Sequence, residues 1–173
     1  MNSHEKYFFD INGYLVVPRI LSLDRVAVLN EAIDNNLDHV RVRSEDSLLS
    51  RNSPALVGTH GRSDISGILN WPQPWCQPFR DLLSFHPALH YMLDLIGDEF
   101  HFGNANGISM TAGTEGCVLH GGGTLVDKHA YRYVNGRMWN NLVGVCYQLA
   151  DINPGDGGFV CVPGSHKASF DTP

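Results

Sequence analysis

The feature that most constrains the fold is a series of short apolar runs between residues 117 and 166. The runs read C-V-L-H-G-G-G, then L-V-G-V-C-Y-Q-L, then G-G-F-V-C-V-P-G-S-H, with glycine-rich or polar turns between them. Runs of this length bounded by turn residues are typical of β-strands. His120 ends the first run beside three glycines, which let backbone or ligand approach closely. This pattern predicts a metal pocket in the mouth of a β-barrel, with His120 in it.

Length and charge narrow the class of protein. The 173 residues suit one domain with a real core, and the net charge of −6, without a run of Lys or Arg, disfavours a nucleic-acid surface. Because no apolar stretch approaches membrane-spanning length and the first residues are polar, we expect neither a membrane partner nor a signal peptide. The four cysteines lack C-x-x-C spacing, and three of them lie in apolar runs. We therefore expect buried free thiols and a cytoplasmic location.

Helical patterns fill the first half of the chain. Ser22 is a suitable N-cap, and apolar residues then recur at helical spacing as far as Asp38. Residues 79–97 predict two helices divided at Pro87 and ended by Gly97.

The remaining segments are less regular. Residues 7–17 predict an Asn-Gly turn and a short β-type run, and residues 40–77 predict a loop. From residue 100 the period changes towards two. A single α+β domain over residues 1–173 follows, with helices in about residues 1–97 flanking a sandwich or barrel of strands in about residues 100–173.

Other histidines are weaker ligand candidates. His60 is best interpreted as an exposed loop histidine, and His129 lies in a polar loop, where it would contact solvent or substrate. His86 and His90 have metal-ligand spacing on a helix, but Pro87 interrupts the helix between them, which favours packing roles. The motifs of a nucleophile elbow, a phosphate-binding loop and a dinucleotide-binding loop are absent from the sequence.

The roles of His120 and His166 stay open on local sequence alone. For His120, ligation competes with a hydrogen-bonded core position. For His166, at the end of P-G-S-H-K, ligation competes with a turn-stabilising role. Asp127 is the nearest carboxylate after His120 and could reach the pocket, whereas Asp156 suits the P-G-D-G-G turn for conformational reasons.

Three segments together resemble the phytanoyl-CoA dioxygenase family. They are F-F-D-I-N-G-Y-L-V-V-P near the start, His120 after a strand, and L-A-D-I-N-P-G-D-G-G-F-V-C-V-P-G-S-H-K. The resemblance implies a double-stranded β-helix (jelly-roll, cupin-like) core and an oxygenase that uses Fe(II) and 2-oxoglutarate to hydroxylate a small organic substrate. His120 would be the first iron ligand, and Asn106, Tyr147 and Gln148 would contact the cosubstrate.

The iron motif departs from the family pattern at one position. The family has H-x-D, whereas this chain has His120-Gly121-Gly122. Related iron halogenases carry glycine or alanine at the carboxylate position, which leaves room for chloride, so a halogenase is one alternative. Asp127 or water could instead fill the position. A non-catalytic binding module on the same scaffold is a further alternative.

A second departure concerns the end of the chain. The family's second iron histidine follows P-G-S-H-K in an H-G-S or H-G-T segment, and the arginine that binds 2-oxoglutarate comes after it. Neither is present here, and His166 matches a motif histidine that the family does not use for iron. We therefore expect a C-terminally truncated jelly roll with an unpaired sheet edge, inactive by itself.

Overall fold

The fold is that of a computed structural model, which describes residues 1–51, 53–121, 131–153, 155–168 and 170. The helices are α1 (Ser3–Asn12), α2 (Leu23–Asp34), α3 (Gln77–Leu83) and α4 (His86–Leu95), with 3₁₀ turns η1 (Leu37–His39), η2 (Glu45–Ser47) and η3 (Ser165–Lys167). The strands are β1 (Val40–Val42), β2 (Ser63–Ile65), β3 (Gly107–Ser109), β4 (Tyr131–Val134) and β5 (Arg137–Asn140).

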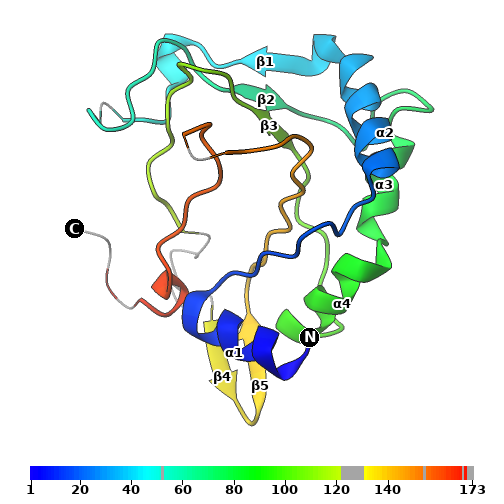
Figure 1. Ribbon diagram of the computed structural model, residues 1–173, viewed down its shortest axis with the longest axis vertical. Helices are drawn as coiled ribbons and strands as arrows, with labels where there is room; N and C mark the ends of the chain where they lie inside the picture. Colours follow the sequence, from blue (N-terminus) through cyan, green and yellow to red (C-terminus); the bar gives the residue numbers. More distant parts are fainter. Residues whose placement is uncertain (52, 122–130, 154, 169, 171–173) are drawn as a thin grey trace.

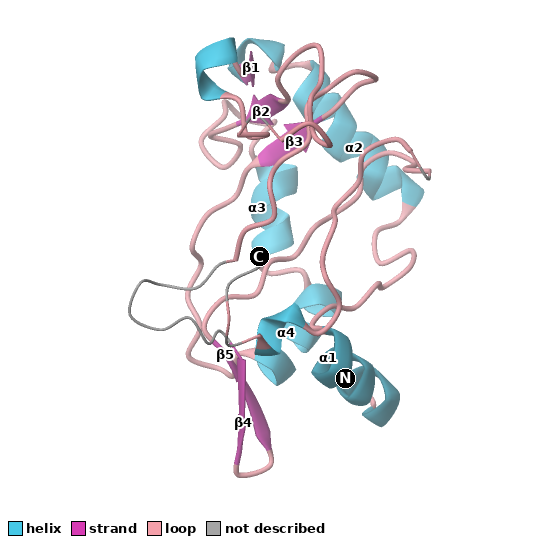
Figure 2. Ribbon diagram, turned by 90° about the vertical axis from the view of Figure 1, so that its left-hand side faces the viewer, coloured by secondary structure: helices cyan, strands magenta, loops and turns pink. Residues whose placement is uncertain are grey.

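The elements gather at two ends of the molecule. A three-stranded antiparallel sheet, in the order β1-β2-β3, lies at one end with α2 beside it (Figure 1). The β4–β5 hairpin lies at the other end, near α1 and α4, and long irregular segments run between the two ends (Figure 2). Each end has its own apolar cluster, one centred on Leu29 and Trp71 and the other on Phe9 and Tyr131.

Helix α1 corrects the prediction for residues 7–17. The side chain of Asn2 accepts a hydrogen bond from the Glu5 N–H, and the Glu5 carboxylate accepts one from the Asn2 N–H. This capping box starts a helix that runs through the aromatic segment and ends at Gly13, which has a φ of 80°. Residues 14–17 form no strand. The prediction was wrong because the Asn2-x-x-Glu5 capping box starts a helix ahead of the aromatic segment, and this helix continues through it to Asn12.

Helix α2 confirms the predicted helix and its N-cap. Ser22 Oγ accepts a hydrogen bond from the Arg25 N–H at 3.3 Å, and Leu29 and Ala32 are completely buried. The helix ends at Asp34, so the apolar spacing extended the prediction too far: Leu37 lies in η1 and is exposed.

The two helices predicted between residues 79 and 97 are confirmed. α3 and α4 are separated at Ser84–Phe85, and Pro87 lies in the first turn of α4, where its missing N–H costs no hydrogen bond. Gly97 follows α4 with a φ of 103°, a conformation that favours glycine. Phe79 and Leu95 anchor the two helices in different apolar clusters.

Short strands were missed on both sides of these helices. β1 and β2 lie inside the segment predicted as loop, and each is three residues long, too short for a periodic signal. The β4–β5 hairpin lies in a segment predicted as a polar loop. Its turn is Asn135-Gly136, with φ of 52° and 79°, the two left-handed residues of a type I′ turn.

The α+β class is confirmed, but the jelly roll is not. The described parts contain small antiparallel sheets and no closed barrel, and residues 117–120, 142–149 and 158–162 are not strands. Apolar side chains in these segments are therefore exposed; Phe159, for example, is 75% exposed. No helix among the described residues has the length and apolarity needed to cross a membrane.

All four cysteines are free thiols, as predicted, but their burial differs from the prediction. Cys76 is buried and Cys117 is half-buried, whereas Cys146 and Cys161 are exposed. The two exposed thiols lie in apolar runs that form no strand.

Candidate functional site

His120 has one property of a metal ligand. Its Nδ1 lies 3.0 Å from the backbone oxygen of Val118. Because a carbonyl oxygen only accepts hydrogen bonds, this contact places the proton on Nδ1 and leaves the lone pair of Nε2 for another partner. Metal-binding histidines commonly have this arrangement. The side chain is exposed, and Cys117 Sγ lies 3.8 Å from Nδ1.

The described residues do not complete a metal site around this imidazole. No three His, Cys, Asp or Glu side chains converge among them. Gly122, Asp127 and His129 lie outside the described residues, so the proposed replacement of the carboxylate ligand stays a prediction. His120 thus suits iron as a single ligand, and the described part of the chain does not gather three such side chains around it.

The predicted cosubstrate residues are dispersed. Asn106 is exposed immediately before β3, and Gln148 is exposed in an irregular segment. Tyr147 is half-buried against the apolar cluster of α2 and α3, and burial raises its pKa. Among the described residues no hydrogen bond joins any of the three to His120, so their role also stays a prediction.

His166 joins the P-G-S-H-K turn to α1. Its Nε2 lies 3.0 Å from the backbone oxygen of Asp10, and its ring packs against Phe9 and Tyr131 at centroid distances of 6.0 and 4.9 Å. These contacts match the turn-stabilising role that the sequence left open.

Asp10 is the centre of this contact. Its carboxylate accepts hydrogen bonds from the Tyr131 hydroxyl and from Lys167 Nζ, the latter at 2.9 Å. The Tyr131 bond and then the Lys167 bond lower the pKa of Asp10, while burial and the Asp10 carboxylate raise that of Tyr131. Asp10, Tyr131, His166 and Lys167 are called the Asp10 clasp below.

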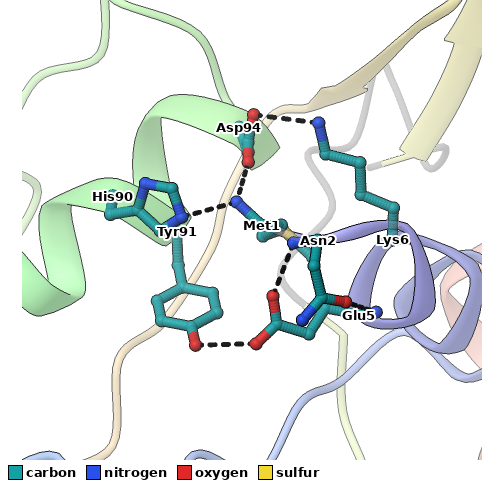
Figure 3. Close-up of polar contacts among 7 residues, drawn as sticks. All are labelled: Met1, Asn2, Glu5, Lys6, His90, Tyr91 and Asp94. Carbon is teal, nitrogen blue, oxygen red and sulfur yellow. Dashed lines mark hydrogen bonds and ion pairs between the residues drawn. The ribbon is translucent and has the colours of Figure 1, made fainter.

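A second polar contact joins α1 to α4 (Figure 3). The Met1 ammonium donates to Asp94 and lies 2.6 Å from His90 Nε2, and Lys6 Nζ lies 3.2 Å from the Asp94 carboxylate. Tyr91 donates to Glu5 at 2.9 Å. His90 therefore takes part in helix packing, as predicted.

His60 and Glu115 hold loops together. The His60 ring nitrogens lie 3.1 Å from the hydroxyls of neighbouring threonines, namely Thr59, Thr111 and Thr114. No sequence motif indicates a role for Glu115, which is 3% exposed. Its carboxylate accepts hydrogen bonds from the N–H groups of Leu49 and Ser50 at 2.7 and 3.0 Å. Burial alone would raise its pKa, but these two bonds lower it overall.

Fold and site together define an α+β domain with one imidazole suited to a metal. The family model for phytanoyl-CoA dioxygenase (PhyH) matches residues 9–172, so the chain belongs to this family. This family belongs to an oxygenase-like superfamily. Its members generally depend on Fe(II) and 2-oxoglutarate, and the family implies a cupin-like fold. No curated protein and no solved structure matched the chain.

Proposed function

We propose that this domain belongs to an Fe(II)- and 2-oxoglutarate-dependent oxygenase that hydroxylates a small organic substrate, with His120 as the first iron ligand. The family match over residues 9–172 is the observation that carries the proposal. Iron held by His120, together with 2-oxoglutarate, would supply dioxygen activation, in which one oxygen atom would enter a substrate C–H bond and the other would enter succinate as 2-oxoglutarate loses CO₂.

The geometry of His120 supports this role. The Val118 carbonyl fixes the tautomer with Nε2 unprotonated, and the exposed ring can meet a metal without rearrangement of a core. Asn106, Tyr147 and Gln148 remain the proposed cosubstrate contacts. The jelly-roll arrangement of the strands is likewise proposed from the family.

The test is the visible charge-transfer absorption of Fe(II) with 2-oxoglutarate, measured anaerobically on this chain and on any longer product of the same gene. We expect the band in the form that binds iron, its loss in His120→Ala, and its retention in His86→Ala, which removes another exposed histidine. Absence of the band from every form, or its survival in His120→Ala, would overturn the proposal.

A halogenase is the second candidate, because Gly122 occupies the position of the family's carboxylate ligand. Chloride would then bind iron where the carboxylate is missing. Chlorinated product that depends on chloride would favour the halogenase, whereas hydroxylated product at every chloride concentration would favour the oxygenase. A binding module without iron would give neither product.

A further inference from the structure

Polar contacts join the turn η3 to the C-terminal end of α1 (Figure 1). The Gly164 N–H donates to the backbone oxygen of Asn12 at 2.9 Å. Lys167 Nζ donates to the Asp10 carboxylate at 2.9 Å, and His166 Nε2 lies 3.0 Å from the backbone oxygen of the same residue. None of these residues is a proposed ligand of iron or of 2-oxoglutarate, so an inference about this turn goes beyond the proposed function.

The imidazole of His166 responds to pH through its other ring nitrogen. Nε2 donates its proton to the Asp10 carbonyl, so Nδ1 of the neutral ring carries none. Nδ1 is buried, has no hydrogen-bond partner among the described residues, and lies against the backbone of Gly13, where an added Cβ would be 2.4 Å away. A proton gained by Nδ1 would therefore put a charge and an N–H where no acceptor meets them, which is unfavourable.

The surroundings of the ring favour its neutral form while the turn is docked. The Asp10 carboxylate on α1 favours a charged ring, but Lys167 beside it opposes this effect. The Tyr131 hydroxyl on β4 stays neutral because burial and then the Asp10 bond raise its pKa. The C-terminal end of α1 also favours a cation. Burial of the ring outweighs these effects and lowers the pKa of His166 below its ordinary value of 6.5.

Helix α1 is held by α4 as well as by this turn. The Tyr91 hydroxyl of α4 donates to the Glu5 carboxylate of α1 at 2.9 Å (Figure 3). In the turn, the ion pair between Lys167 and Asp10 joins two side chains that are each 41% exposed, and such pairs contribute little to stability. Loss of the His166 contacts can therefore free the turn while α1 stays in place.

We infer that the Asp10 clasp is a pH-sensitive switch, in which η3 is docked on α1 while His166 is neutral and is released when His166 gains a proton. In the released state both ring nitrogens are hydrated, and the charge lies in water rather than against Gly13. Residues 158–162, an irregular segment that leads into the turn, gain freedom with it. The apolar cluster around Leu29 and Trp71, at the other end of the molecule, is unchanged.

The test is nuclear magnetic resonance of the complete chain between pH 7.5 and 5. The ring nitrogen signals of His166 report its protonation. Hydrogen exchange of the Gly164 N–H, relative to an unstructured amide at the same pH, reports docking of the turn. We expect this amide to lose protection over the pH range in which the ring gains a proton, by up to about tenfold per pH unit.

The Leu29 amide, inside α2, is the internal reference and should stay more strongly protected than the Gly164 amide at every pH. Protection at Gly164 that does not change with pH would overturn the inference. Protection equal to that of Leu29 throughout would also overturn it, because the turn would then open only when the whole domain unfolds.

His166→Gln keeps a donor for the Asp10 carbonyl but cannot become charged, so its Gly164 protection should not depend on pH. His86→Gln, at an exposed histidine, should respond to pH as the wild type does. A wild-type response in His166→Gln would show that another group releases the turn, and this would overturn the inference.

Gly13→Ala decides the question if His166→Gln does not dock at any pH. Because its Cβ would lie 2.4 Å from His166 Nδ1, the Gly164 amide should lose about tenfold or more of its protection already at pH 7.5, while the Leu29 amide stays more strongly protected. Unchanged protection of Gly164 in this variant would contradict the role of the buried ring.

Discussion

His166 Nε2 lies 3.0 Å from the backbone oxygen of Asp10, although 156 residues separate the two in sequence. The carbonyl accepts, so Nε2 carries the proton and Nδ1 of the neutral ring does not. Nδ1 is buried and has no hydrogen-bond partner among the described residues. Protonation of the ring would therefore place a second N–H where no acceptor meets it.

The free energy of unfolding should decrease as the pH is lowered and His166 becomes charged. Burial lowers its pKa below the ordinary value of 6.5, and this effect exceeds the opposite effect of the Asp10 hydrogen bond. Below pH 6.5 the unfolded state therefore binds more protons than the folded state, so the contribution of His166 is complete above pH 6.5 and is lost as pH falls below it. The measurement is the free energy of unfolding by urea between pH 7.5 and 5.

His166→Gln keeps an N–H donor but cannot titrate, so it should flatten this dependence. His86→Gln, at an exposed histidine, should not. The same slope in wild type and His166→Gln would show that His166 does not control the pH response. Four carboxylates also have shifted pKa values, namely Glu5, Asp10, Asp94 and Glu115. Their pKa values are lowered from ordinary values of 4.5 or less, so their effect on stability falls mainly below the measured pH range.

Gly13→Ala should destabilise the protein more than Gly136→Ala. Both glycines have similar positive φ, 80° and 79°, so both substitutions cost about 1–2 kcal/mol of backbone strain. A Cβ at residue 13 would in addition lie 2.4 Å from His166 Nδ1, whereas at residue 136 it would meet nothing within 4 Å. We expect an extra loss of about 1–3 kcal/mol in Gly13→Ala, measured by urea unfolding.

The pair of variants separates steric contact from backbone strain. Equal losses in Gly13→Ala and Gly136→Ala would mean that the turn containing His166 moves away from α1 at little cost. In that case the Asp10 clasp would contribute little to the joining of the two ends of the chain.

Tyr131→Phe should cost about 1–2 kcal/mol because it removes the hydroxyl that donates to the Asp10 carboxylate while keeping the buried ring. Tyr133→Phe is the matched control two residues along the same strand, exposed and without that bond, and should change stability by less than about 0.5 kcal/mol. The measurement is unfolding at pH 7. In an Asp10→Ala background, which lacks the acceptor, Tyr131→Phe should cost nothing further, and this would confirm that the two groups act together.

Helices with strong caps and wide apolar stripes were predictable from sequence, and short strands were not. Ser22 and Pro87 marked real helix boundaries, because capping and the missing proline N–H act locally. The apolar runs after residue 100 predicted strands, but a strand requires a neighbouring strand, and most of these runs lack one in the described structure. The Asn135-Gly136 dipeptide is a hairpin-turn signal, although the segment around it was predicted as a polar loop.

The candidate site shows the same division between local and long-range information. The sequence singled out His120 and His166 by their positions at the ends of apolar runs. It could not show that His166 meets Asp10 or that Glu115 meets Leu49, because these contacts join segments 156 and 66 residues apart. Only the folded chain brings such partners together.

Glu115→Gln should destabilise the loop that precedes His120. The carboxylate accepts the N–H groups of Leu49 and Ser50, whereas a glutamine can accept one of them and turns its own NH₂ towards the other. An unpaired buried donor and the loss of a charged acceptor together cost about 1–3 kcal/mol. Glu99→Gln, at an exposed carboxylate, is the control and should be nearly neutral.

Because the folded pKa of Glu115 is lowered, the stability it contributes is present above the unfolded value of 4.5 and is lost as pH falls below it. The difference between wild type and Glu115→Gln should therefore shrink towards pH 3. A difference that stayed constant from pH 7 to pH 3 would show that the ionised carboxylate is not the stabilising group.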